Sequence, residues 1–336
     1  MKPHTMALCG AAALTLVAGA ALAADTSVKV RKVGKAEVSW NRVTYRDELM
    51  AQLQPGLTWR LGKGDATRLK LEKMALVVAG AGVLLPGEQT LNLRFWAWDN
   101  WELVVFEEND WKWSEESTEF GIFEASVGKS AEKKEHSKAL EIALNQTTRG
   151  NPTTIDAAAV TGADAGLADL FAIPDDVEYD PELRKRWEAL PWVEFVLQFG
   201  PHRGVIGFEP VPIRELKGAF ARKDAKKRKV TIIGLDLPEP AVRAQYLEEH
   251  EGELPVAVLT EHGKGGEHLV LHLSGGEGPL LWPRTRSGGD AGEPLEGTRT
   301  EAKLKKAPNS VFCELEGSQL SVTMAPWVYT FDLAGR

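Results

Sequence analysis

The stretch from Pro55 to Phe106 constrains the fold of this chain most strongly. Its apolar runs are short and typical of β-strands, and Pro86-Gly87 and Asp99-Asn100 interrupt them. Two residues of the Asp-Asn type between apolar runs are typical of a hairpin turn. The pattern therefore predicts consecutive antiparallel strands, that is, a β-meander.

The rest of the chain carries one clear helical signal and several further strand signals. An Asp-Pro pair opens a predicted short helix over residues 181–190, and Pro191 ends it. Trp192 to Phe199 alternates as a strand should, and similar runs return towards the C-terminus. Residues 130–146 fit both a helix and a strand, and both readings stay open.

These elements predict a mainly β protein with two β-sandwich or meander-type domains and a partly helical insertion. The basic run from Lys217 to Lys229 is interpreted as a solvated linker or loop. The expected parts are a signal peptide at 1–23, a β domain at 24–125, a mixed insertion at 126–220 and a second β-rich domain at 221–336.

The N-terminal residues are typical of an export signal. Lys2 precedes an uncharged apolar run, and Ala21-Leu22-Ala23 fits the small-x-small rule for cleavage before Ala24. We expect a periplasmic or extracellular location after cleavage near Ala23-Ala24. Since no later run has 18 consecutive apolar residues, no transmembrane segment is expected in the mature chain.

Charge and cysteine usage narrow the class of protein further. The formal net charge of -8 disfavours nucleic acid as a partner. Cys9 leaves with the signal peptide, so Cys313 would be the one cysteine left and no internal disulfide is expected. Cys313 alternates with apolar neighbours at strand period, which predicts a small buried hydrophobic side chain.

Eleven tryptophans are present, and five of them lie between residues 96 and 113. A two-residue turn at Asp99-Asn100 would place Trp98 opposite Trp101. One face of the hairpin would then carry the candidate binding residues Trp96, Trp98, Trp101, Arg94 and Asn92. Such a face suits two roles, either burial against another part of the protein or stacking on sugar rings.

No catalytic motif stands out, and no cofactor is predicted. Most of the histidines fall late in the chain, and we expect them on the surface. A metal site is the alternative, with candidate ligands His250, His262, His268 and His272. His268 and His272 are too far apart along one strand to bind the same ion directly, so other residues would have to fold beside one of them.

The order of several short motifs resembles a bacterial family catalogued as domain of unknown function 2911. The motifs are Trp59-Arg60-x-Gly62-x-x-Asp65-Ala66-Thr67, then Leu85-Pro86-Gly87, then Trp101-Glu102-Leu103-Val104. The resemblance covers residues 38–106, and Lys63, Gly64 and Asp65 stand where the family usually has Ala-Asn-Glu. The resemblance implies an exported, β-rich protein and no particular activity.

Together these features favour a non-enzymatic, envelope-associated binding or interaction module. We expect the partner to be either a cell-envelope polysaccharide (a glycan) or another envelope protein. The alternative is a metal- or carboxylate-dependent hydrolase that acts on an envelope polymer.

Overall fold

The fold is taken from a computed structural model. It describes residues 28–48, 54–62, 66–78, 82–97, 100–107, 119–129, 136–152, 181–221, 227–250, 252–261, 268–276, 278–285, 292–303 and 310–334. The predicted signal peptide lies outside these ranges. No helix among the described residues is long and apolar enough to cross a membrane.

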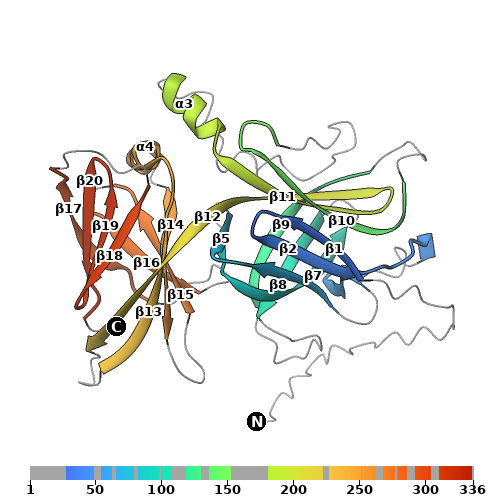
Figure 1. The fold of residues 1–336 in the computed structure, drawn as a ribbon, viewed down its shortest axis with the longest axis horizontal. Helices are drawn as coiled ribbons and strands as arrows, with labels where there is room; N and C mark the ends of the chain where they lie inside the picture. The colour runs from blue at the N-terminus through green and yellow to red at the C-terminus, as the bar shows by residue number, and fades with distance from the viewer. Residues whose placement is uncertain are drawn as a thin grey trace, which may run out of the picture.

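The protein is mainly β, as predicted, and its strands form two curved bodies joined by one long strand (Figure 1). The strands of the first body are β1 (Val28–Val33), β2 (Ala36–Asn41), β3 (Leu57–Arg60), β4 (Thr67–Leu71), β5 (Met74–Val78), β6 (Gly82–Leu84), β7 (Gly87–Ala97), β8 (Asn100–Glu107), β9 (Glu119–Lys129), β10 (Ser137–Thr148) and β11 (Pro191–Gly200). The joining strand is β12 (His202–Ala221).

The second body follows in sequence. Its strands are β13 (Lys227–Leu235), β14 (Glu253–Glu261), β15 (His268–Ser274), β16 (Leu280–Thr285), β17 (Leu295–Glu301), β18 (Phe312–Glu316), β19 (Gln319–Met324) and β20 (Trp327–Asp332). The helices α3 (Pro181–Glu188) and α4 (Pro240–His250) accompany the strands.

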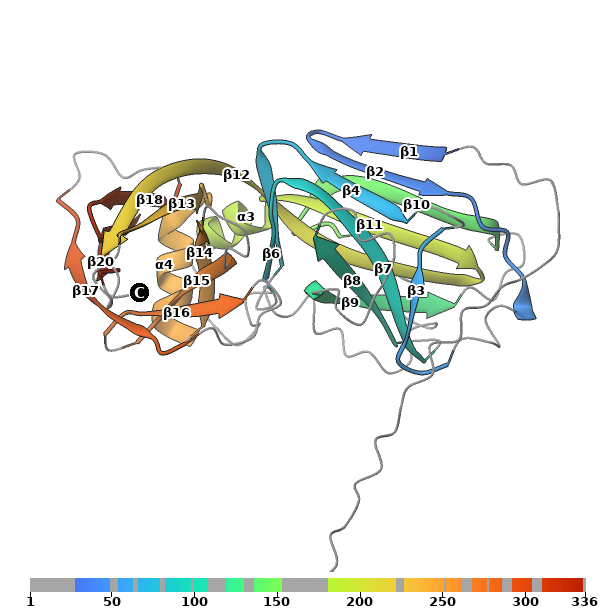
Figure 2. The same cartoon turned by 90° about the horizontal axis from the view of Figure 1, so that it is seen from below.

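The first sheet curls into a half-barrel (Figure 2). Its antiparallel pairings run β2–β4–β7–β8–β9–β12–β11–β10. A bridge between Thr44 and Ala139 then brings the start of β10 back to the segment that follows β2. Two backbone hydrogen bonds flank this bridge, from Tyr45 to Lys138 and from Leu140 to Val43. The sheet therefore encloses an interior, into which its apolar side chains point.

Strand β12 belongs to both bodies. Its first residues pair with β11 and β9, residues Glu209–Pro212 pair with β5, and Ile213–Ala221 pair with β13. The second sheet continues from β13 through β14, β15 and β16, and β17 connects it to β20, β19 and β18. Helix α4 lies against these strands (Figure 2) and buries Val242, Ala244 and Leu247 in their core.

The strand pairing does not match the predicted boundaries of the insertion, residues 126–220. Strands β9, β10 and β11 are walls of the half-barrel, and the chain enters the second sheet at Ile213, not near residue 220. The basic run from Lys217 was interpreted as a linker, but its described residues belong to a hairpin that pairs Lys217 with Thr231 and Ala221 with Lys227. Backbone pairing is indifferent to side-chain charge, so a basic composition does not by itself exclude a strand.

Several local predictions are confirmed. Helix α3 and strand β11 occupy the predicted helical and strand segments at 181–190 and 192–199. The ambiguous segment is a strand over its described part, Ser137–Thr148, while residues 130–135 lie outside the described ranges.

Candidate functional site

The β7–β8 hairpin, which carries the predicted binding residues, has a different register from the predicted one. Phe95 pairs with Trp101 and Ala97 with Asn100, so the register shifts at Trp96. The predicted pairing of Trp98 with Trp101 is therefore wrong. Because successive side chains of a strand alternate between faces, this shift moves Trp101 to the face that carries Phe95.

Among the described members of the predicted binding set, only Trp96 is an exposed residue. Trp101 is 2% exposed and belongs to the hydrophobic core, and Asn92 is also 2% exposed. Arg94 lies 3.4 Å from Glu102, its cross-strand partner, in a mostly buried ion pair. Trp98 lies outside the described residues. The predicted face with three indoles is thus not formed, because the side chain of Trp101 lies on the other face of the hairpin.

Trp96 remains at the surface, and a second exposed apolar residue lies on the neighbouring strand β3. Its ring is 43% exposed, and the side chain of Leu57, at the start of β3, is 41% exposed. Leu57 pairs with Phe95 across β3 and β7. The benzene ring of Trp96 covers Gly56, where an added Cβ would approach the ring to 3.3 Å. Trp96 and Leu57 together form what we call the rim patch, at one end of the half-barrel.

The interior of the half-barrel beside β3 is lined by apolar side chains alone. The lining residues are Trp59, Leu61, Leu93, Phe95, Trp101, Leu140, Leu197 and Phe199. The free space among them is about 10 Å³, roughly room for one water molecule. The indole N–H of Trp101 is buried and has no hydrogen-bond acceptor among the described residues.

Aromatic rings close the wall of the half-barrel between β3 and the segment after β2. The ring of Phe199 lies 5.2 Å from that of Trp59 and 5.0 Å from that of Tyr45. The ring of Tyr45 packs closely against Gly200, where an added Cβ would approach the ring to 2.2 Å. Burial, with help from a hydrogen bond to Asp47, raises the pKa of Tyr45 to about 12. These rings close the wall by packing, without hydrogen-bonded pairing of the two segments among the described residues.

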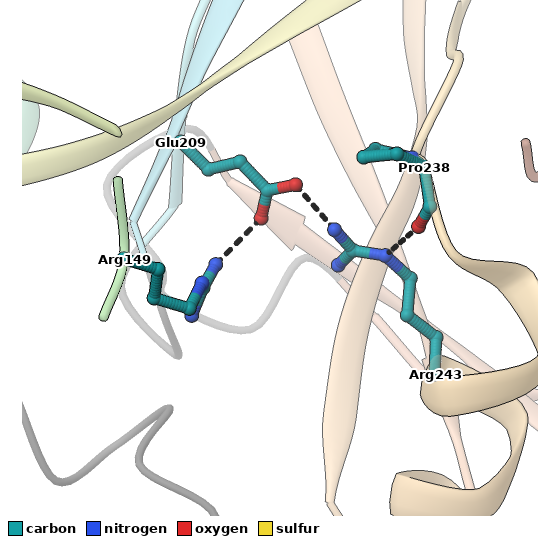
Figure 3. A network of polar contacts seen from close by, with 4 residues as sticks. All are labelled: Arg149, Glu209, Pro238 and Arg243. Carbon is teal, nitrogen blue, oxygen red and sulfur yellow. Dashed lines mark hydrogen bonds and ion pairs between the residues drawn. The ribbon is translucent and has the colours of Figure 1, made fainter. Parts of the chain in front are cut away.

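A buried ionic network lies where the two bodies meet (Figure 3). Glu209 on β12 accepts a hydrogen bond of 2.7 Å from Arg149, which follows β10, and another from Arg243 on α4. Arg243 also donates from Nε to the Pro238 carbonyl at 2.6 Å. All three charged side chains are nearly fully buried. The network therefore ties the half-barrel to the helix of the second body.

Two indoles complete this junction. The guanidinium of Arg149 lies 4.3 Å from the ring centre of Trp187 and 4.8 Å from that of Trp192. Burial lowers the pKa of Arg149 to about 10 despite the opposing effect of Glu209, so the group remains charged at neutral pH. The sequence pattern did not indicate this network, because its members come from segments separated by tens of residues.

The predicted metal ligands are only partly placed. His272 is 2% exposed, so the prediction of a surface histidine is wrong for this residue. Its Nδ1 lies 3.4 Å from Glu253 Oε2, and Arg284 holds the same carboxylate at 2.9 Å. Both faces of β15 are covered here, so the alternation along the strand wrongly predicted that the face of His272 is exposed.

The remaining histidine candidates are His250, His262 and His268. His262 and the side chains of His250 and His268 lie outside the described residues. Within the described ranges, no three side chains of His, Cys, Asp or Glu gather closely enough to hold a metal ion. The metal site and the hydrolase alternative stay predictions.

The prediction for Cys313 is confirmed. The thiol is buried, and its Sγ lies 3.1 Å from the carbonyl oxygen of Val256. Burial raises the pKa of Cys313 to about 12. Since the thiolate is the reactive form of cysteine, this residue is a packing residue and not a nucleophile.

No protein-family model, curated protein or solved structure matches this chain.

Proposed function

We propose that this protein is an exported, non-enzymatic binding module of the cell envelope, and that it contacts its partner through the rim patch of Trp96 and Leu57. The partner is a component of the envelope, either a polysaccharide or another envelope protein. Export follows from the apolar leader and the cleavage pattern near Ala23-Ala24. The resemblance to domain of unknown function 2911 over residues 38–106 supports the same location.

The observation that carries the proposal is an exposed indole with a second exposed apolar residue on the neighbouring strand. Four large hydrophobic side chains are exposed among the described residues, and two of them, Trp96 and Leu57, lie on neighbouring strands at the rim, since Leu57 pairs with Phe95, the residue before Trp96. Tryptophan is enriched at contact surfaces because it offers a large apolar area at little cost in conformational entropy. The rim patch is therefore the best-supported contact surface of the described molecule.

Export is tested by the intact mass of the protein isolated from its native host. The mass should correspond to a chain that begins at Ala24. Recovery of the full-length chain from the cytoplasm would contradict the proposed location.

Binding is tested by sedimentation of the purified mature protein with insoluble peptidoglycan and with envelope polysaccharide. The wild type should sediment with at least one polymer, and Trp96→Ala should reduce the bound fraction about tenfold, the loss expected for one well-placed aromatic contact. Trp96→Phe keeps an aromatic ring and should retain most of the binding.

Val30→Ala is the matched control, because Val30 is an exposed apolar residue on β1, away from the rim patch. It should bind like the wild type. Urea denaturation verifies that each variant is folded. Equal sedimentation of wild type, Trp96→Ala and Val30→Ala would remove the rim patch from the proposal.

A further inference from the structure

We propose that strand β1 docks this protein on the surface of a membrane that contains anionic phospholipids. The contact surface is what we call the β1 patch, and it consists of Val28, Lys29, Val30, Arg31, Lys32 and Lys35. This inference goes beyond the proposed function and does not rest on it, because it assigns a second surface, on a different strand from the rim patch, and a different ligand.

The β1 patch carries four cations that have no counter-ion among the described residues. Three of them are exposed and one is half-buried, namely Arg31, Lys32 and Lys35, and then Lys29. Glu37 is the one acidic residue of strands β1 and β2, and it lies opposite Lys32 in the register. No described carboxylate forms an ion pair with any of the four cations, so their positive charge is not neutralised within the described fold.

Several exposed cations elsewhere on the described surface are paired with carboxylates. Such pairs are Arg68–Glu88, Arg184–Glu188 and Arg299–Glu248, at 2.6, 2.9 and 3.0 Å. The chain as a whole has a formal net charge of -8. The β1 patch is therefore a positive region on an acidic molecule, and such a region orients the molecule towards an anionic surface.

Two exposed apolar side chains lie among these cations. Val28 is 58% exposed and Val30 is 47% exposed, and both lie on one face of β1 because they are two residues apart. A soluble polyanion gains nothing from exposed valines. At a bilayer, apolar side chains enter the boundary between head groups and acyl chains, while neighbouring cations contact the lipid phosphates. The combination of valines and cations therefore favours a lipid surface.

The position of β1 suits contact with an extended surface. It lies at the outer edge of the first body (Figure 2), and among the described strands it pairs only with β2. The hairpin is anchored from β2, whose residues Ala36, Val38 and Trp40 are at most 1% exposed. Pairing of β1 with the β1 of a second copy is disfavoured, because like charges would face each other.

The test is flotation of the purified mature protein with phosphatidylcholine vesicles that contain either no phosphatidylglycerol or about 30% of it. We expect binding only to the anionic vesicles, and we expect it to weaken as NaCl rises from about 0.05 M to about 0.5 M, since salt screens the charges. Arg31→Gln/Lys32→Gln should lower the partition coefficient about thirtyfold, the change expected for two cations at an anionic bilayer.

Arg184→Gln/Lys185→Gln is the matched control, because it changes the net charge equally on exposed residues of α3. It should bind like the wild type. Val28→Ser/Val30→Ser keeps all four cations and should lower the partition coefficient about tenfold through lost apolar contact. Trp96→Ala should leave vesicle binding unchanged, so a failure of the rim patch is distinguishable from a failure of this inference.

Equal binding to both kinds of vesicle would overturn the inference, and so would an equal loss in the two charge variants. Unchanged vesicle binding of Val28→Ser/Val30→Ser, with displacement of the wild type by inorganic polyphosphate, would show that the patch recognises a soluble polyanion and would also overturn it. Urea denaturation verifies that each variant is folded. If Arg31→Gln/Lys32→Gln is not, Lys35→Gln in the turn after β1 decides, with an expected loss of about fivefold.

Discussion

Replacing Glu209 with glutamine should destabilise the protein by about 3 kcal/mol. Glu209 is the one carboxylate that pairs with both Arg149 and Arg243 in the buried network. The substitution keeps the size of the side chain and removes its charge, so two buried guanidiniums lose their anion. Removing one partner of a buried ion pair costs roughly 3–5 kcal/mol. We take the lower end of this range, because the side-chain carbonyl of the introduced glutamine can still accept a hydrogen bond from a guanidinium.

The assay is urea denaturation, followed by tryptophan fluorescence and by circular dichroism. Coincident transitions from the two probes would justify a two-state free energy for a chain whose bodies share β12. Glu188→Gln is the matched control, because Glu188 pairs with Arg184 on the exposed face of α3 at 2.9 Å. It should change the free energy of unfolding by less than about 0.5 kcal/mol. A loss below about 1 kcal/mol for Glu209→Gln would refute the reasoning that this network joins the two bodies.

Three further predictions concern single side chains. Contacts with His272, and then with Arg284, hold the pKa of the Glu253 carboxyl below its ordinary value of 4.5, although burial acts in the opposite direction. The ionised carboxylate therefore stabilises the folded state above about pH 4.5. This stabilisation is lost as the pH falls through the lower pKa of the folded state. Glu253→Gln should therefore flatten the acid loss of stability in urea titrations below about pH 4.5, and an unchanged slope would contradict this. Cys313 should resist iodoacetamide at about pH 8 in the native protein and react in urea, whereas stoichiometric native labelling would show an accessible thiol. Trp59→Ala should lower the free energy of unfolding by roughly 2–4 kcal/mol, less than for a fully buried indole, and a change below about 1 kcal/mol would show that the ring is not packed on Phe199.

Local signals in the sequence predicted the elements that depend on neighbouring residues. The Asp-Pro pair and Pro191 delimited α3, and the alternation from Trp192 to Phe199 predicted β11, because capping and period-two burial act within a few residues. The burial of Cys313 followed from the same alternation on β18. None of these predictions required knowing which strands pair with one another.

Predictions that depended on pairing were less successful. The candidate site required the turn of the β7–β8 hairpin to lie at Asp99-Asn100, and the observed closing pair, Ala97 and Asn100, lies one residue earlier. That shift, with the irregularity at Trp96, was enough to bury Trp101. The Arg149–Glu209–Arg243 network was missed for a related reason, since its contacts span 60 and 34 residues of sequence. Charged residues so far apart give no local pattern.

Hydrogen–deuterium exchange tests the central claim, that the rim of the half-barrel is the contact surface, most directly. Purified mature protein would be compared with and without the envelope fraction that it sediments with. The account predicts slower exchange confined to β3 and the adjoining end of β7, around Leu57 and Trp96, and no change in β14–β20. Protection confined to the second body, or no protection at β3 under conditions of measured binding, would contradict the account.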